Sequence, residues 1–244
     1  LRARRTTPRI ATAQDGGEIL FIPGGSLQFH HGYTDLEERL SFMDRIGVHR
    51  QVLSLPGLFG IDSLPRPECE QALHAFNDAA ADACRRYPDR FLGLAALPFA
   101  DMEASLAEYR RCREELGLIG AILPNNAFAT LEHAQAMVGL FREADRLGAH
   151  FFIHPGRRPD EAARQAASGA ATPTDNSMAR RALDVQADVG QAMVTLLFTD
   201  FLDAFPKVSV HVANLGGTLP AVVERMDHTV KARGLQMPLP SQQM

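Results

Sequence analysis

The sequence predicts an α/β protein built on a parallel β-sheet. Three observations support this: short apolar runs recur along the chain, helical patterns lie between them, and most of the runs stop at a proline. Parallel strands that are covered on both faces appear as nearly continuous apolar runs, and a crossover helix joins each strand to the next. The alternation begins after residue 35.

Five segments are predicted as buried strands. Four of the five end at a proline, which has no N–H to donate to the next strand and therefore ends the pairing. The segments cover residues 50–56, 91–98, 120–124, 150–155 and 208–214.

The intervening segments carry apolar residues at helical spacing. Apolar stripes run through residues 69–87, 134–144 and 183–201. Asp101 stands at the N-cap position of a further helix, and Thr218 is placed to cap the last one, with Pro220 in its first turn. Strand and helix therefore alternate, as βαβ crossovers require.

Two architectures fit this alternation, a closed (β/α)8 TIM-type barrel and an open doubly wound sheet. An open nucleotide-binding sheet is expected to carry Gly-x-Gly-x-x-Gly or a Gly-x-x-x-x-Gly-Lys-Ser/Thr loop, and the sequence contains neither. The pattern therefore favours an α/β barrel, as a single domain over residues 1–244. Because a barrel has eight strands, the one in this chain is expected to be incomplete.

Two segments depart from the alternation. Residues 9–23 are predicted to form an inserted β-hairpin, because Asp15-Gly16 suits a tight turn between two apolar stretches. Residues 156–178 are polar and rich in alanine and glycine. A connection of that length is unusual in a compact domain, so a loop or a lid is expected there.

Composition narrows the classes of function. The 244 residues carry a formal net charge of −4, which argues against a nucleic-acid partner. No apolar stretch reaches the roughly 18 residues that a membrane span needs. The three cysteines have no metal-type spacing and cannot all pair, so reduced thiols and a cytoplasmic location are expected.

The chemistry is expected at the carboxyl-terminal ends of the strands, where barrel enzymes place their active sites. His154 ends the fourth of the five runs, and neutral imidazole is a good ligand for zinc and similar divalent ions. The alternative is a histidine that bonds only to the backbone. Asn125 follows the third run and is a candidate for binding a substrate carboxylate or amide, or for making a turn.

Four segments match motifs of one known family, in the right order and spacing. They are residues 91–98, residues 116–121, His150-Phe-Phe-Ile-His-Pro155 and Leu215-Gly-Gly-Thr-Leu-Pro220. In that sequence they resemble the third strand, the fourth strand, the fifth strand and the segment after the sixth strand of the amidohydrolase-related family of metal-dependent hydrolases and decarboxylases. The resemblance covers about residues 35–230.

The resemblance implies one divalent metal ion, zinc or alternatively manganese, with His154 as a ligand. The family's other ligands are a His-x-His pair on the first strand and an aspartate after the eighth. No His-x-His occurs in these residues. The first strand would precede residue 1, and the seventh and eighth would follow residue 244.

The resemblance also assigns candidates around that metal. Asn214 stands where many relatives carry a sixth-strand histidine, and an asparagine cannot act as a general base near neutral pH. His211 is the second catalytic candidate, although strand alternation relative to Asn214 would turn it towards the outer helices and favours a structural role. The family's arginine at the place of Arg225, in the last helix, implies carboxylate binding or a structural role. Arg157, on the loop after His154, and Asn125 are candidates for binding substrate from their positions in the sequence.

The sequence therefore predicts a metal-dependent hydrolase that acts on a small carboxylated or lactone-like substrate through a metal-activated water. A decarboxylase of a carboxylated aromatic or muconate-type substrate is the alternative. Asn214 and the missing His-x-His also leave open an inactive barrel that binds a small carboxylate. A homodimer is expected because relatives in the family often dimerise.

Overall fold

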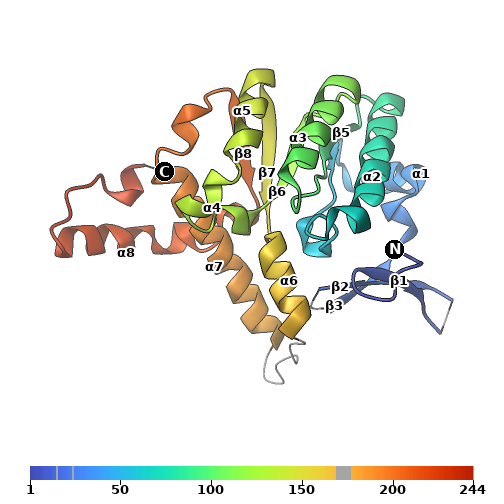
Figure 1. Cartoon of the computed structure of the whole chain (residues 1–244), viewed down its shortest axis with the longest axis horizontal. Helices are drawn as coiled ribbons and strands as arrows, with labels where there is room; N and C mark the ends of the chain where they lie inside the picture. The colour runs from blue at the N-terminus through green and yellow to red at the C-terminus, as the bar shows by residue number, and fades with distance from the viewer. Residues whose placement is uncertain (15, 24, 169–176, 244) are drawn as a thin grey trace.

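A computed structural model describes residues 1–14, 16–23, 25–168 and 177–243, with the side chains of residues 164–168, 177 and 178 not described (Figure 1). It contains a three-stranded antiparallel sheet near the N-terminus and a five-stranded parallel sheet flanked by helices. Both sheets were predicted from the sequence, the first as a hairpin.

The parallel sheet has the strand order β4-β5-β6-β7-β8, so every strand pairs with its neighbours in the sequence. A doubly wound sheet must reverse its strand order at a switch point, and this sheet does not. The order is that of a barrel wall, which confirms the predicted incomplete barrel. The strands are β4 (Gln51–Leu53), β5 (Phe91–Ala95), β6 (Gly120–Pro124), β7 (Ala149–His154) and β8 (Val208–Val212).

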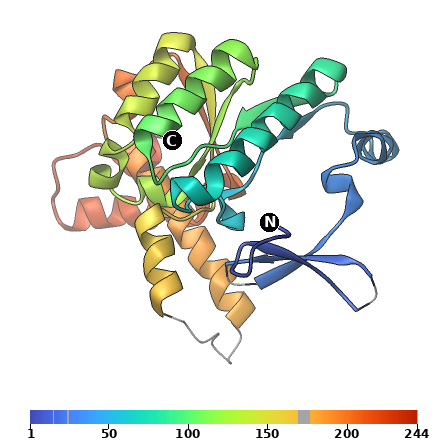
Figure 2. The same ribbon diagram turned by 45° about the vertical axis from the view of Figure 1, so that its right-hand side comes forward.

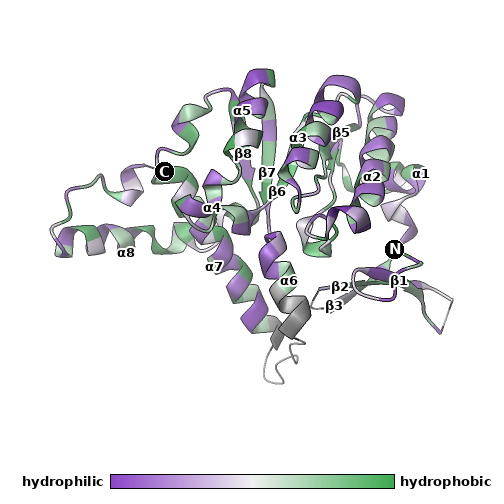
Figure 3. Cartoon of the chain, viewed as in Figure 1, coloured by the Kyte–Doolittle hydropathy of each residue, from purple (hydrophilic) through white to green (hydrophobic). Residues whose placement is uncertain are grey.

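The main helices pack against one face of this sheet. Phe151 and Ile153 of β7 join a core to which α3 contributes Tyr109, α5 contributes Phe141 and α7 contributes Leu196. The helices show alternating hydrophilic and hydrophobic stripes in Figure 3, as expected for helices covered on one side. The helices are α1 (Leu36–Ile46), α2 (Arg66–Arg86), α3 (Met102–Arg110), α4 (Leu131–Gln135), α5 (Val138–Leu147), α6 (Pro159–Ser168), α7 (Ser177–Leu197) and α8 (Leu219–Ala232).

Gly120 sets how closely β6 and β7 approach. A Cβ atom at this position would lie 1.7 Å from the carbonyl oxygen of His150, so no side chain can be accommodated without moving a strand. The register pairs Gly120 with His150 and Pro124 with His154. The glycine therefore helps to fix the level at which His154 leaves the sheet.

The predicted N-terminal hairpin is confirmed and extended by one strand. β1 (Arg9–Thr12) pairs antiparallel with β2 (Glu18–Ile22), with Ile10 opposite Leu20, and β2 also pairs with β3 (Gly25–Phe29). Ile10 and Leu20 form a small core that also contacts Phe59, in the turn after β4. Figure 2 shows this sheet beside the turn, on the side where β4 ends.

The segment expected to be a loop or lid, residues 156–178, contains α6 and the first residues of α7. The loop alternative is therefore wrong for residues 159–168, whereas the lid alternative stays a prediction. Pro159 begins α6, and Asp160 and Glu161 lie in its first turn, where carboxylates favour the positive end of the helix dipole. The expectation for residues 169–176 lies outside the described residues.

The predicted helix caps have different outcomes. The Asp101 carboxylate accepts a hydrogen bond from the Ala104 N–H at 3.0 Å, as an N-cap should. Thr218 precedes α8, but its side chain makes no capping hydrogen bond, because its backbone is already close to helical (φ −81°, ψ −11°). Pro220 lies in the first turn, as predicted.

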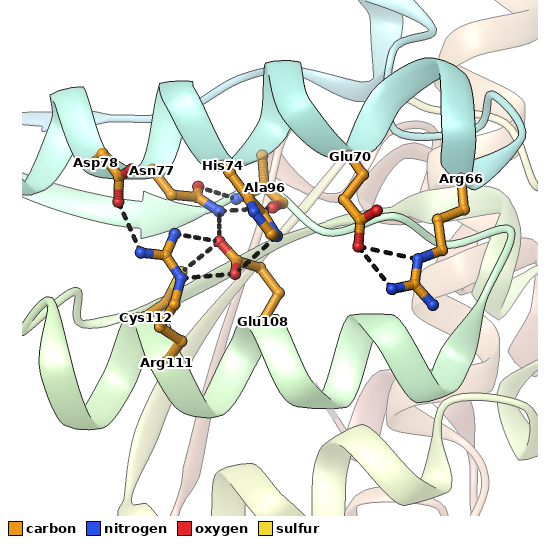
Figure 4. A network of polar contacts seen from close by, with 9 residues as sticks. All are labelled: Arg66, Glu70, His74, Asn77, Asp78, Ala96, Glu108, Arg111 and Cys112. Carbon is orange, nitrogen blue, oxygen red and sulfur yellow. Dashed lines mark hydrogen bonds and ion pairs between the residues drawn. The ribbon is translucent and has the colours of Figure 1, made fainter.

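A buried polar network joins α2, α3 and β5 on the helical side of the sheet (Figure 4). The Glu108 carboxylate, 3% exposed, accepts from Arg111 through two nitrogens at 2.8 Å and from Asn77 Nδ2 at 2.7 Å. Asn77 also bonds both backbone groups of Ala96. Burial alone would raise the pKa of Glu108, but hydrogen bonds from Arg111 and Asn77 outweigh it and hold the pKa below its usual range. The network therefore fixes the backbone at the end of β5 from the helical side of the sheet.

Candidate active site at the carboxyl-terminal strand ends

The carboxyl-terminal ends of the parallel strands share one edge of the sheet. β7 ends beside α6 in Figure 1, and α7 runs from the far end of α6 back towards the same edge. The loop after β8 contacts α7, since the Thr218 N–H donates to the Gln186 carbonyl at 3.1 Å. This edge therefore brings together His154, Asn125, Arg157 and Asn214, the expected place for a barrel active site.

His154 is held as a metal-ligating imidazole should be. Its Nδ1 lies 3.2 Å from the carbonyl oxygen of Pro155, a contact that places the proton on Nδ1 and leaves the lone pair of Nε2 available. The side chain is partly buried, and burial lowers its pKa, which favours the neutral form that binds metals. Its ring also contacts Phe152, with centroids 5.3 Å apart.

Among the described residues, no group of three or more histidine, cysteine, aspartate or glutamate side chains is arranged to hold a metal ion. His154 fits the role of one ligand, and the described residues do not complete a group of three around it. The coordination chemistry that the resemblance implies therefore requires ligands from outside the described residues.

His211 lies on the same face of the sheet as His154, so the expectation that it points to the outer helices is wrong. Its strand partner is Phe152, and the two rings stack at 4.9 Å. Val210 and Val212, on either side, are the residues that pack into the helical core. Because the Phe152 ring contacts both histidines, His211 lies one layer below His154 and is separated from it.

Asn214 begins the turn after β8 and is exposed. Its backbone is left-handed, with φ +55°, and Leu215 follows with φ +53° and a side chain that is 93% exposed. The strand has therefore ended before Asn214, and its amide is accessible at the edge that His154 occupies. No hydrogen bond from its side chain to the described residues is present.

Asn125 is buried rather than open to a ligand. Only 2% of the residue is exposed, and its Oδ1 accepts a hydrogen bond from the Gly156 N–H at 2.9 Å. The Nδ2 group is buried and has no partner among the described residues. The side-chain oxygen of Asn125 is thus already hydrogen-bonded to the turn that follows His154.

The adjacent arginines 157 and 158 have different surroundings. Arg158 donates to the Asn126 carbonyl at 3.0 Å and pairs with Asp160 at 3.0 Å and Glu161 at 3.2 Å. Arg157 is partly buried, yet within the described ranges its guanidinium donates no hydrogen bond and has no carboxylate oxygen within ion-pair distance. Burial lowers the pKa of Arg157, and nearby Arg181 lowers it further. Glu161 and Asp188 act in the opposite direction.

Two acidic residues near these groups were not singled out from the sequence. Asp62, 5% exposed, follows the turn after β4, and burial raises the pKa of its carboxyl to about 7. Asp188 of α7 is partly buried, and burial together with Glu161 raises its pKa. Neither lies at a strand end or in a recognisable motif, so only the folded arrangement reveals them.

Arg225 lies apart from the other candidates. It is exposed on α8, which projects away from the rest of the fold in Figure 1. Within the described ranges its guanidinium makes no hydrogen bond or ion pair. Within one chain, Arg225 therefore does not lie at the edge that carries His154.

The fold is the wall of a (β/α)8 barrel, and the candidate residues lie at the edge where such barrels carry their sites. It belongs to the amidohydrolase family, whose sequence profile matches residues 28–237. The predicted family is therefore confirmed. Most of the N-terminal antiparallel sheet, up to residue 27, lies outside the matched region.

Similar proteins are named as decarboxylases. The chain is 28% identical to gamma-resorcylate decarboxylase of Rhizobium radiobacter over 85% of its length and 64% of the relative's. It is 29% identical to 2-amino-3-carboxymuconate-6-semialdehyde decarboxylase of Dictyostelium discoideum, over 82% of its own length and 53% of the relative's. The chain thus spans between about half and two thirds of these relatives.

A solved structure gives the same picture. 5-carboxyvanillate decarboxylase of Novosphingobium aromaticivorans, with bound manganese and a nitrobenzoic acid, superposes with a TM-score of 0.62 at 26% identity. The alignment covers 83% of this chain and 57% of that one. The described residues include no helix long and apolar enough to cross a membrane, and the three cysteines are unpaired.

Proposed function

We propose that the protein carrying this chain is a metal-dependent decarboxylase of a small carboxylated aromatic acid. The observation that carries the proposal is His154, whose Nδ1 is tied to a backbone carbonyl and whose Nε2 is left for a metal at the carboxyl-terminal end of β7. The decarboxylase names of the relatives favour this activity over hydrolysis, the first expectation from the sequence.

The chain's own residues would bind and orient the substrate. A divalent ion held in part by His154 supplies an electrophile for the substrate's oxygen atoms. The exposed Asn214 amide can hold a substrate oxygen or hydroxyl but cannot move a proton near neutral pH. His211 is separated from His154 by Phe152, so proton delivery to the ring carbon is assigned to a group beyond these residues.

Arg157 is the substrate-binding candidate that the structure supports most directly. Its neighbours Glu161 and Asp188 belong to α6 and α7, and α7 contacts the loop after β8 at Gln186. Arg157 therefore lies near α6 and α7, and among the described residues its guanidinium has no hydrogen-bond partner. Such a guanidinium can bind a carboxylate through two parallel hydrogen bonds.

The remaining expectations stay proposals. A small carboxylated acid is the proposed ligand, and manganese and zinc are both proposed as the metal, since the similar solved structure contains manganese. A cytoplasmic location is proposed from the unpaired cysteines. A homodimer is proposed as well, and Arg225 on the projecting α8 remains a proposed substrate-binding residue.

An inactive barrel that binds a small carboxylate is the second candidate. Asn214 at the end of the sixth barrel strand and the lack of a complete ligand group among the described residues favour it. In that case Arg157 would still bind benzoate-type acids, but no carbon dioxide would be released.

The test compares the full-length natural protein with His154→Ala and His211→Ala. Metal content by mass spectrometry and carbon dioxide release from a panel of hydroxybenzoates are measured for each. We expect near-stoichiometric metal in the natural protein, its loss with His154→Ala, and its retention with His211→Ala. Metal and acid binding without carbon dioxide release would favour the inactive barrel. Absence of metal from the reconstituted natural protein would contradict the proposed function.

A further inference from the structure

Three turns meet at the carboxyl-terminal edge of the sheet, at the backbone just after His154. They carry Gly57 after β4, Asn125 after β6, and Gly156 after β7. Gly156 is two residues beyond His154, so whatever holds Gly156 also holds the backbone from which the imidazole projects.

The two glycines are in close contact. A Cβ at Gly57 would lie 3.3 Å from the Cα of Gly156 and 2.9 Å from Oδ2 of Asp62. A Cβ at Gly156 would lie 3.0 Å from the Cβ of Pro124. Both positions therefore serve close packing between backbones.

Hydrogen bonds fix Gly156 from a second direction. Its N–H donates to Asn125 Oδ1 at 2.9 Å, and its carbonyl accepts from the Asn126 N–H at 3.4 Å. Both the N–H and the carbonyl of Gly156, in the turn after β7, are thus hydrogen-bonded to the turn after β6.

The same junction contains two buried polar atoms without a partner among the described residues, Asn125 Nδ2 and Asp62 Oδ1. A buried donor without a partner destabilises the folded state, so an apolar side chain at position 125 would avoid that cost. The Asn125 oxygen, by contrast, makes a bond that an apolar side chain cannot replace.

We propose that Asn125 is a positioning residue: its bond to the Gly156 N–H fixes the turn after β7, and with it the direction of the His154 imidazole. This inference rests on the proposed function of His154 as a metal ligand. It replaces the expectation that Asn125 binds substrate directly, because the amide is buried and its oxygen is already used.

The test uses the full-length protein and two near-isosteric variants. Asn125→Leu removes the acceptor, and Asn125→Asp keeps an oxygen at the same place. Asn126→Leu is the matched control, since the Asn126 side chain bonds to Glu161 instead. Affinity for Mn²⁺, amide exchange at Gly156 and the KM for substrate are measured for each.

We expect Asn125→Leu to speed exchange at Gly156 and to weaken Mn²⁺ binding by about tenfold, in the range seen when groups that support a ligand are removed. Asn125→Asp should restore most of both, and Asn126→Leu should change neither. A higher KM for Asn125→Leu with unchanged exchange and metal affinity would make Asn125 a substrate ligand and overturn the proposal.

A natural protein that binds no Mn²⁺ would contradict the proposed function, whereas exchange at Gly156 would still report whether Asn125 holds the turn. Slow exchange at Gly156 in Asn125→Leu would overturn the positioning role, whatever the metal result. If Asn125→Leu does not fold, the comparison of Asn125→Asp with the natural protein decides, because loss of protection despite a retained oxygen contradicts the proposal.

Discussion

The two faces of β7 differ in what their side chains do. Phe151 and Ile153 are fully buried against the helices. His150, Phe152 and His154, which alternate with them, are only partly buried on the opposite face. In this strand the residues that stabilise the fold and the residues that offer chemistry are therefore adjacent in sequence and opposite in space.

The difference teaches where substitutions should act. Residues on the helical face are expected to change the free energy of unfolding and leave the site intact, since Phe151 contacts Tyr109 and Phe141. Residues at the carboxyl-terminal edge are expected to change ligand binding. Asp62 and Asn125 are exceptions that combine complete burial with a position at the edge.

The largest expected effect is on the helical face. Phe151→Ala should lower the free energy of unfolding by about 3–5 kcal/mol, because it removes a fully buried ring and leaves a cavity among aromatic neighbours. Denaturant unfolding of the full-length protein measures the change. Metal content per folded molecule should stay constant. A loss of metal without a loss of stability would contradict the separation of stabilising and ligand-binding residues between the two faces.

Asp62 sharpens the comparison because its burial at the edge makes stability depend on pH. Burial raises the pKa of its carboxyl from 3.8 to about 7, so the folded state holds a proton that the unfolded state releases. This contribution to stability is complete below pH 3.8 and is lost as the pH rises through 7, at about 1.4 kcal/mol per pKa unit.

Asp62→Asn should abolish that loss, because an amide does not ionise. The free energy of unfolding is measured for both proteins from pH 5 to pH 8. As the pH rises, the variant should become increasingly more stable than the natural protein. Cys69, the titratable neighbour, has its pKa raised to about 11 by burial and stays neutral throughout this range. A difference that does not vary with pH would contradict an ionising Asp62.

The adjacent arginines test the edge for substrate binding. Arg157→Met should raise the KM for a carboxylated substrate by at least about tenfold, equivalent to 1.4 kcal/mol, with kcat changed less. Arg158→Met is the control, because Arg158 is already bonded to Asn126, Asp160 and Glu161. The reverse pattern, with KM rising only for Arg158→Met, would move the substrate site away from Arg157.

The smallest effect is expected on the outer surface. Arg66 pairs with Glu70 at 2.8 Å and with Asp101 at 3.1 Å, but the three side chains remain 46%, 34% and 34% exposed to water. Arg66→Ala should therefore leave the free energy of unfolding unchanged within error, since exposed ion pairs contribute little. A clear loss of stability would show that this pair belongs to the Glu108 network.

The parallel strands could be predicted because burial on both faces leaves a local signature, an apolar run ended by a proline. α6 was missed because the alanine- and glycine-rich composition of residues 156–178 suggested a connection, although Pro159 and the acidic first turn are helix-start signals. β3 was missed because Gly25-Ser-Leu-Gln-Phe29 is mostly exposed and contains only two apolar side chains, Leu27 and Phe29, too short a pattern to stand out.

The position of His154 at the end of a strand could be predicted, but the face on which His211 lies could not. Its orientation was inferred from Asn214, three residues later, on the assumption of a regular strand. The strand ends at Val212, and Asn214 has a left-handed backbone, so alternation does not extend that far. The roles of Asn125 and Asp62 depend on contacts between turns far apart in the sequence, which no local pattern records.

The turn after β8 keeps four consecutive residues at positive φ, from Asn214 to Gly217, and two of them are not glycine. Left-handed backbone costs an ordinary side chain such as Leu215 about 1 kcal/mol or more. Selection for thermal endurance alone would be expected to place glycine at both positions. The chain instead retains an amide and a bulky apolar group that point outward beside the site, which makes this turn the first place to look when engineering a new preference for substrate.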